Sequence, residues 1–278
     1  MGLLLLILTL QAEFTLHVGV PTYFKMDKTR VSIVSYLNSK PFLYGLKKSF
    51  IADQIDVSVD IPSDVAAKLR TDNTDVGLIP VGALADLQDY RLIGDFCIGA
   101  HGNVRTVVLA SDVPFKEIDT ILLDYQSRTS VILARVLSHF FWKKIFNFEH
   151  TSAGFENDLI RGNKAGVVIG DRVFEMEKKY RYTLDLSEEW VNFTKLPFVF
   201  AVWVANKNVS EQFKRNFNLA LDLGIKNISE IVKQEQANYP DVDINDYFSR
   251  NINFILDDNK MEGMNKFLEL SDKLLSLD

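Results

Sequence analysis

Short apolar runs alternate with helical patterns along this sequence from Val31 onward. Continuous apolar runs such as DVGLIPV (75–81) and AGVVIGD (165–171) are typical of strands that helices cover on both faces. A helix-start signal, PSD (62–64), follows one of the strand-like runs. Strands that alternate with helices predict an α/β fold with largely parallel sheets.

The alternating pattern forms two successive blocks, and the apolar run LPFVFAVWVA (196–205) predicts a strand that returns from the second block to the first. We therefore expect two lobes joined by two crossings of the chain. Residues 26–112 together with 196–278 form the first lobe, and residues 113–195 form the second. A cleft between α/β lobes is a natural site for a small molecule, because the carboxyl ends of the strands point into it.

The N-terminal segment contains one apolar run, LLLLILTL (3–10). Its eight residues fall short of the roughly 20 that a membrane-spanning helix needs, so no stable membrane insertion is expected. A secretory signal is the alternative, but no Lys or Arg precedes the run. We expect residues 1–25 to lie outside the folded unit, with a polar start at Met26 leading into the first strand.

Charge and composition exclude several function classes. The formal net charge of −6 argues against a nucleic-acid-binding protein, although a local field can still favour an anionic small ligand. The single cysteine, Cys97, cannot form an intramolecular disulfide, which fits the reducing cytoplasm. We interpret Cys97 as a small buried residue rather than a nucleophile. The four histidines lack metal-ligand spacing, and no dinucleotide or phosphate-binding glycine loop is present, so neither a metal nor a cofactor is predicted.

The turn after the first strand, SYLNSKP (35–41), opens a helix. Asn38 and Ser39 would face the cleft at this helix N-terminus, where free N–H groups and the helix dipole favour an anion. The alternative is that one of them only caps the helix.

An equivalent turn in the second lobe, DYQSRTS (124–130), places Ser127, Thr129 and Ser130 at another helix start. Plain capping explains these residues equally well. Two helix N-termini that face each other across a cleft, however, suit a ligand with two carboxylates.

Further polar residues stand at other predicted strand ends. Arg105 and Thr106 begin a strand, where Thr106 presents a hydroxyl to the cleft and Arg105 either binds substrate or pairs with a surface acid. His101 is either a general base or a loop histidine without a catalytic role. Gly170 and Asp171 end an apolar strand, where Asp171 either orients a group in the cleft or caps the next helix.

Six ordered blocks of the chain resemble the chorismate dehydratase family, which opens the futalosine route to menaquinone. The resemblance runs from Val31 to about Trp203 and rests on VSYLNSKPFLYGL (34–46), DVGLIPVGAL (75–84), VRTVVLAS (104–111), LDYQSRTSVILARVL (123–137), AGVVIGD (165–171) and DLSEEWVNFTKLPFVFAVW (185–203). It implies a two-lobe fold of the type II periplasmic-binding-protein class. Many family members have Ser where this chain has Thr106, so the hydroxyl is kept.

The resemblance implies a carbon–oxygen lyase that removes water from the dianion chorismate, without a redox cofactor, to give 3-[(1-carboxyvinyl)oxy]benzoate. It implies that Asn38 hydrogen-bonds the reacting ring or its leaving hydroxyl. An amide is no general base, so we expect the substrate's own enolpyruvyl carboxylate, held by Thr106 and backbone N–H groups, to take the ring proton. Thr129 and Ser130 would bind a carboxylate across the cleft. The alternatives are a solute-binding protein of a transporter and the sister enzyme dihydroxynaphthoate synthase.

Overall fold

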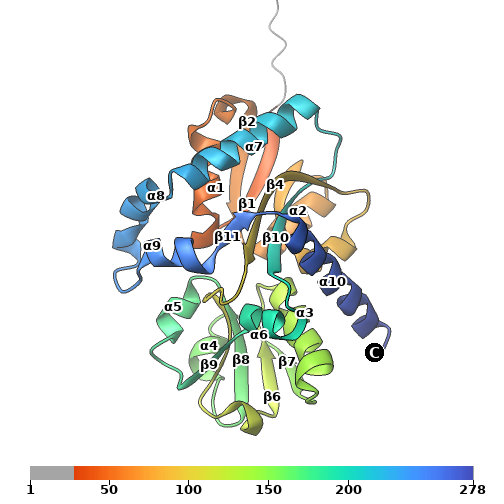
Figure 1. Ribbon diagram of the computed structural model, residues 1–278, viewed down its shortest axis with the longest axis vertical. Coiled ribbons are helices and arrows are strands. Elements are labelled where there is room, and N and C mark those ends of the chain that lie inside the picture. The colour runs from red at the N-terminus through yellow and green to blue at the C-terminus, as the bar shows by residue number, and fades with distance from the viewer. Residues whose placement is uncertain (1–27, 278) are drawn as a thin grey trace, which may run out of the picture.

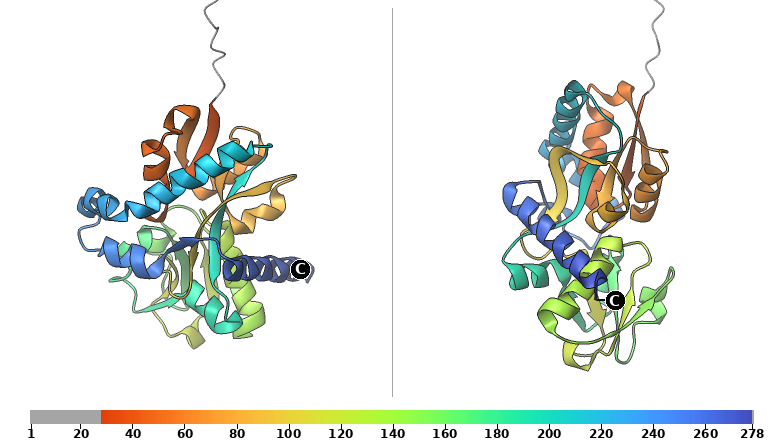
Figure 2. Two further views of the ribbon diagram at one scale, coloured as in Figure 1. Left: turned by 45° about the horizontal axis from the view of Figure 1, so that its top comes forward. Right: turned by 90° about the vertical axis from the view of Figure 1, so that its right-hand side faces the viewer.

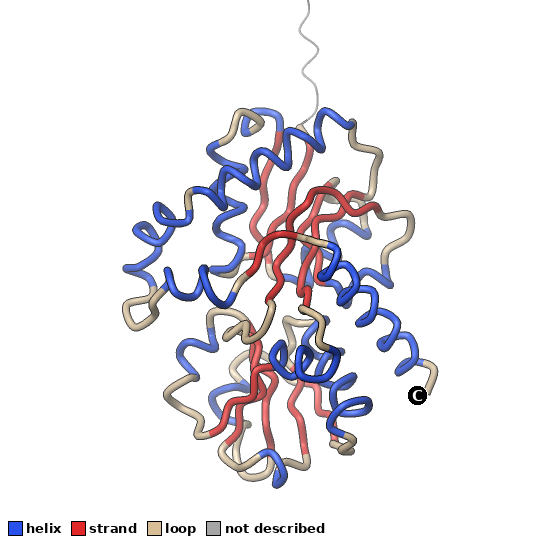
Figure 3. The backbone as a smooth tube through the Cα atoms, in the orientation of Figure 1, coloured by secondary structure: helices blue, strands red, loops and turns tan. Residues whose placement is uncertain are grey.

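The computed structural model describes residues 28–277, so the predicted extension at residues 1–25 falls outside the described residues. The described chain forms two lobes, one above the other in Figure 1, and each lobe has its own sheet. In both lobes the strands lie inside and the helices outside, as Figure 3 shows by colour. These two sheets with their covering helices confirm the predicted α/β class.

The first lobe contains a mixed six-stranded sheet in the order β11-β4-β10-β3-β1-β2. The parallel part is β2-β1-β3, and β10 pairs antiparallel with both β3 and β4. Strand β11 closes the other edge, antiparallel to β4. The strands are β1 (Thr29–Val34), β2 (Ile55–Asp60), β3 (Val76–Pro80), β4 (Arg91–Ala100), β10 (Phe198–Ala205) and β11 (Asn253–Ile255).

Helices from both ends of the described chain cover this first sheet. They are α1 (Lys40–Lys48), α2 (Pro62–Arg70), α7 (Glu211–Lys226), α8 (Ile228–Glu235), α9 (Ile244–Asp246) and α10 (Asp258–Leu275). Helix α7 packs directly across α1 (Figure 1). At their crossing a Cβ added to Gly45 would overlap the carbonyl oxygen of Ala220, and one added to Gly224 would overlap that of Pro41. The two helix backbones therefore touch because both positions lack a side chain.

The second lobe contains a five-stranded sheet in the order β7-β6-β8-β5-β9. Strand β6 pairs parallel with β7 and β8, whereas β5 pairs antiparallel with β8 and β9. The strands are β5 (Val107–Ser111), β6 (Thr120–Leu123), β7 (Asn147–His150), β8 (Lys164–Ile169) and β9 (Tyr182–Asp185), and the helices are α3 (Arg128–Val136), α4 (Phe155–Asp158), α5 (Arg172–Met176) and α6 (Leu186–Thr194).

Strand β5 differs from the sequence expectation, which placed residues up to 112 in the first lobe. It pairs with β8 and β9 in the second sheet, so the chain first crosses between the lobes at residues 101–106. The run is apolar on both faces and its residues are buried, and such a run fits the interior of either sheet equally well. The return crossing precedes β10, which lies in the first sheet.

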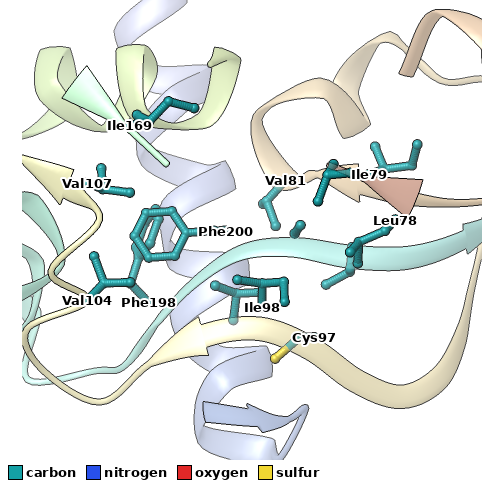
Figure 4. Packing of buried hydrophobic residues seen from close by; sticks show 14 of the residues in the cluster. Leu78, Ile79, Val81, Cys97, Ile98, Val104, Val107, Ile169, Phe198 and Phe200 are labelled. Carbon is teal, nitrogen blue, oxygen red and sulfur yellow. The ribbon is translucent and has the colours of Figure 1, made fainter. Parts of the chain in front are cut away.

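One hydrophobic core continues from the first lobe into the second. It includes Leu78 and Ile98 of the first sheet and Val107 and Ile169 of the second, with Phe200 between them (Figure 4). Residues of both sheets pack together here, and the right-hand view in Figure 2 shows one lobe above the other with this junction between them.

Cys97 lies in this core with no exposed surface, and its thiol contacts the carbonyl oxygens of Asn253 and Ile255. Burial raises the pKa of the Cys97 thiol to about 12. The interpretation of Cys97 as a small buried residue is therefore confirmed. No helix within residues 28–277 is long and apolar enough to cross a bilayer.

Candidate functional site

A cavity lies at the junction of the two lobes and encloses about 530 Å³ of empty space, including the part that is open to solvent. Its walls come from strand ends of both sheets, from the first crossing and from the N-terminus of α3. The lining residues are Val34, Tyr36, Asn38, Pro62, Pro80, Ile98, Val104, Thr106, Val107, Ser127, Thr129, Ser130, Ile169, Gly170, Phe200 and Ala201.

Asn38 reaches the cavity from a short helical turn, η1 (Leu37–Ser39), that directly follows β1. A strand that ends inside the junction and turns at once into a helix presents its next side chains to the cleft. The Asn38 carboxamide oxygen Oδ1 is buried and has no hydrogen-bond partner within the described residues. Because a buried acceptor without a partner is costly, this oxygen is a candidate contact for a ligand.

The N-terminus of α3 forms the opposite wall. The Ser127 hydroxyl caps the helix by accepting the Ser130 backbone N–H at 3.0 Å. The Thr129 hydroxyl accepts the Gly82 N–H of the first lobe at 3.0 Å and donates to the Phe200 carbonyl at 3.3 Å. Ser130 lines the cavity beside the first turn of this helix, where backbone N–H groups without an intrahelical partner favour an anionic ligand.

Thr106 closes the cavity at the end of the first crossing. Its hydroxyl oxygen lies 3.0 Å from the hydroxyl of Tyr247 and 3.4 Å from the Val104 carbonyl. Tyr247 is fully buried, and burial raises its pKa above the ordinary value, so the phenol keeps its proton.

Tyr36 and Gly170 meet across the junction. The Tyr36 hydroxyl donates to Gln126 Oε1 at 2.6 Å, which joins the first lobe to the second. Gly170 has a φ of +68°, and a Cβ there would lie 2.6 Å from the Tyr36 ring. The glycine is thus required both by its left-handed backbone and by the close approach of the ring.

The cavity walls carry hydroxyl, amide and apolar groups. Among the described lining residues there is no Asp, Glu, His, Lys, Arg or Cys, and the one ionisable side chain is Tyr36. Burial raises the pKa of Tyr36, so this phenol stays neutral. Within residues 28–277 no cluster of three or more His, Cys, Asp or Glu side chains is placed to hold a metal ion.

A family model described as menaquinone biosynthesis matches residues 29–273, which is nearly all of the described chain. The chain belongs to the menaquinone biosynthesis family.

Solved structures of low sequence identity show the fold of this menaquinone biosynthesis family member. Protein AF1704 from Archaeoglobus fulgidus has a TM-score of 0.69 at 16% identity, over 88% of this chain and 97% of that one. An ABC transporter protein from Parabacteroides distasonis has a TM-score of 0.64 at 17% identity, over 88% and 92%. The Candida albicans CA3427 gene product, described as having the generic periplasmic binding protein fold, has a TM-score of 0.63 at 15% identity, over 89% and 91%. The predicted periplasmic-binding-protein fold is confirmed.

Six of the nine site residues expected from the sequence line the cavity of this menaquinone biosynthesis family member, and three do not. The six are Asn38, Thr106, Ser127, Thr129, Ser130 and Gly170. The side chains of the other three, Ser39, Arg105 and Asp171, form hydrogen bonds or ion pairs with residues outside the cavity lining or with the backbone. The helical turn η1 directs the Ser39 hydroxyl to the carbonyl oxygens of Val34 and Tyr36, at 2.5 and 2.8 Å.

Arg105 pairs with an acidic residue, the alternative that the sequence left open for it, whereas Asp171 makes a contact that the local sequence does not indicate. Arg105 has a left-handed backbone, and its guanidinium forms an ion pair with Glu177 at 2.6 Å and stacks over the Phe174 ring. Asp171 accepts the backbone N–H of Leu37. Both side chains support the junction from outside the cavity.

Two tyrosines at the site were not expected from the sequence of this family member. Tyr36 lies inside the quoted segment 34–46, but an aromatic residue there is also typical of ordinary packing. Tyr247 is 141 residues from Thr106 along the chain, and no local motif indicates their contact.

Proposed function

We propose that this protein is a chorismate dehydratase, a lyase that converts chorismate to 3-[(1-carboxyvinyl)oxy]benzoate and water in menaquinone biosynthesis. In this reaction the C3–H and C4–O bonds of the ring break, and the ring becomes aromatic. The C3 proton goes to a base, and the hydroxyl group leaves as water after it gains a proton. The menaquinone biosynthesis family and the resemblance of six sequence blocks support this assignment.

The observation that carries the proposal is the chemistry of the cavity wall, which offers hydrogen-bond donors and acceptors but no carboxylate or imidazole among the described lining residues. A general base must lie within hydrogen-bond reach of the proton that it removes. The enolpyruvyl carboxylate of chorismate itself is therefore the proposed acceptor of the C3 proton.

The polar groups of the cavity fit the remaining steps. The Thr106 hydroxyl would hold the enolpyruvyl carboxylate, and Asn38 would hydrogen-bond the C4 hydroxyl as it leaves. The Ser130 hydroxyl and the N-terminus of α3 would bind the ring carboxylate on the opposite wall, since a helix N-terminus favours an anion. The apolar walls exclude water and strengthen these interactions. We place the reaction in the cytoplasm, because a chain with a single cysteine fits a reducing compartment.

The experiment is a product assay with the purified full chain and chorismate, followed by chromatography of the aromatic product. We expect turnover by the wild type and a loss of kcat by about 100-fold or more in Asn38→Ala, as for removal of one polar contact to a transition state. Asn147→Ala is the matched control, because Asn147 is exposed on β7, far from the cavity.

The outcomes separate this proposal from its alternatives. Chorismate bound without product would favour a solute-binding protein, a role that the shared fold also supports. No binding of chorismate, with conversion of cyclic dehypoxanthine futalosine instead, would favour dihydroxynaphthoate synthase. Wild-type kcat in Asn38→Ala would remove Asn38 from the mechanism.

A further inference from the structure

Tyr247 lies just outside the cavity wall and contacts a residue that forms the wall. Its side chain is fully buried, and it begins the helical turn η7 (Tyr247–Asn251) near the end of the first lobe. Its hydroxyl is 3.0 Å from Thr106 Oγ1. The ring packs edge-on against Phe174 of the second lobe, with ring centroids 5.3 Å apart and an interplanar angle of 89°. Packing from both lobes therefore fixes the position of this phenol.

Asn38 is the second polar neighbour of the phenol: burial raises the pKa of Tyr247, and the side chains of Thr106 and Asn38 act in the opposite direction, as hydrogen-bond donors to the phenol oxygen do. The carboxamide oxygen of Asn38 remains without a partner within the described residues. Tyr247 thus contacts Thr106 and is influenced by Asn38, the two side chains that the proposed function places at the reacting ring.

The donors and acceptors of the Tyr247 phenol, the Asn38 carboxamide and the Thr106 hydroxyl can be paired in a way that suits the proposed substrate. A phenol has a single proton to donate and an oxygen that accepts. When that proton goes to Thr106 Oγ1, the threonine's own O–H points to the Val104 carbonyl at 3.4 Å, a long contact that a ligand acceptor would replace. The phenol oxygen then accepts an N–H of Asn38, and Asn38 Oδ1 stays free to accept an O–H from the ligand.

We propose that Tyr247 is a positioning residue that sets the direction of a chain of hydrogen bonds. In this chain the Asn38 N–H donates to the Tyr247 oxygen, and the Tyr247 O–H donates to Thr106 Oγ1. The ligand then meets a donor at Thr106 and an acceptor at Asn38. This arrangement selects a substrate that carries a carboxylate and a hydroxyl group close together. The inference rests on the proposed function for the identity of that substrate, but the orientation of Asn38 can be measured without turnover.

The kinetic test is Tyr247→Phe, which removes only the hydroxyl. We expect kcat with chorismate to fall by about 10- to 100-fold because the reacting ring is held less accurately, while KM changes by less than about threefold. The double variant Tyr247→Phe/Thr106→Val should lose no more activity than the more impaired single variant, since both break the same chain. Additive losses, or wild-type kcat in Tyr247→Phe, would overturn the proposal.

Tyr180→Phe is the matched control, because Tyr180 is also buried and its hydroxyl also makes one hydrogen bond, to the Glu156 carbonyl at 2.5 Å in the second lobe. Tyr180 does not line the cavity, so this variant should keep wild-type kcat. An equal loss of kcat in both variants would mean that any buried phenol is needed, which contradicts a specific role for Tyr247.

The second readout is hydrogen exchange of the Asn38 side-chain amide, followed by NMR on protein with ¹⁵N-labelled asparagine and assigned through Asn38→Ala. Exchange should be at least about tenfold faster in Tyr247→Phe than in the wild type. If the wild type does not convert chorismate, the proposed function fails while this measurement still decides the orientation of Asn38. Should Tyr247→Phe not fold, Thr106→Val removes the acceptor of the Tyr247 proton and should lower kcat with chorismate by the same 10- to 100-fold, and an unchanged kcat would overturn the proposal. Unchanged exchange overturns the proposal.

Discussion

The backbone N–H of Leu37 donates to both carboxylate oxygens of Asp171, at 3.1 and 3.0 Å. Leu37 belongs to the first lobe and Asp171 to the second, and Tyr239 of the first lobe donates its hydroxyl to the same carboxylate at 2.7 Å. The neighbours of this pair in sequence, Asn38 and Gly170, both line the cavity. One carboxylate therefore joins the lobes directly beside the candidate site.

Removal of this carboxylate should favour an open arrangement of the lobes. In Asp171→Ala we expect a larger radius of gyration of the ligand-free protein by small-angle X-ray scattering. We also expect KM for chorismate to rise by about tenfold, since each lost hydrogen bond to a charged group is worth about 1.5–3 kcal/mol. Glu175→Ala is the control, because Glu175 is exposed on the adjacent helix α5. An unchanged radius and KM would show that Asp171 does not hold the lobes together.

His101 should be dispensable for turnover. Its Nε2 lies 3.2 Å from the ammonium of the buried Lys260, which also pairs with Asp257 at 2.9 Å, and His101 does not line the cavity. Burial and the charge of Lys260 lower the pKa of His101. We expect His101→Ala to keep kcat within about threefold of wild type, with an unaltered pH–rate profile between pH 5 and 8. A collapse of the rate would restore histidine as the proton acceptor.

Asp75 should make the stability of the first lobe depend on pH. Its carboxylate accepts the backbone N–H of Arg30 at 2.8 Å and pairs with the guanidinium of Arg30 at 2.7 Å and with Lys207 at 3.0 Å. Burial raises the pKa of Asp75, but the hydrogen bonds and charges of Arg30 and Lys207 outweigh it, so the pKa lies well below its ordinary value. The stabilisation is therefore complete above the unfolded-state pKa and is lost as the pH falls through the folded-state pKa.

Denaturant unfolding of Asp75→Asn at several pH values tests this sign. At pH 7 the variant should lose about 1–3 kcal/mol of unfolding free energy, and its difference from the wild type should shrink below about pH 4. Asp53→Asn changes an exposed carboxylate and should match the wild type throughout. A difference that grows as the pH falls would contradict the assignment.

The contact between helices α1 and α7 should not tolerate a methyl group. Gly224→Ala places a Cβ against the carbonyl of Pro41, so the helices must separate, at a cost of about 1–3 kcal/mol in unfolding free energy. Gly102→Ala is the matched control, because a Cβ at Gly102 meets no atom within 4 Å. Thermal unfolding of both variants checks the expectation, and equal melting temperatures would show that the helices adjust without cost.

The sequence predicted the α/β class because the apolar runs of both sheets are continuous and helical patterns separate them. It did not place β5 correctly, since Val107–Ser111 is apolar on both faces and the choice of sheet depends on pairing with β8 and β9. Such pairing involves residues 56 positions away, as for Ala110 and Gly166, to 77 positions away, as for Val108 and Asp185, and local pattern carries no information about it.

The candidate site was predictable where it follows strand ends, as for Asn38 and Ser130. Ser39 and Arg105 stand in the same local context, but a helical turn and a left-handed backbone direct their side chains away from the cavity. Tyr247 had no local signal, because its role depends on a contact with Thr106 between distant parts of the chain. What the sequence missed is therefore side-chain direction and long-range contact.

The position of β10 has a consequence for the order in which the protein matures during synthesis. Within the described sheet β10 is the link between β3 and β4, yet it is translated after the whole inserted lobe, residues 107–194. The inserted lobe can complete its sheet while the emerging chain still lacks the strand that joins the two halves of the other sheet. Until then the edges of β3 and β4 that β10 will cover stay unpaired, and unpaired apolar strand edges favour aggregation of a nascent chain.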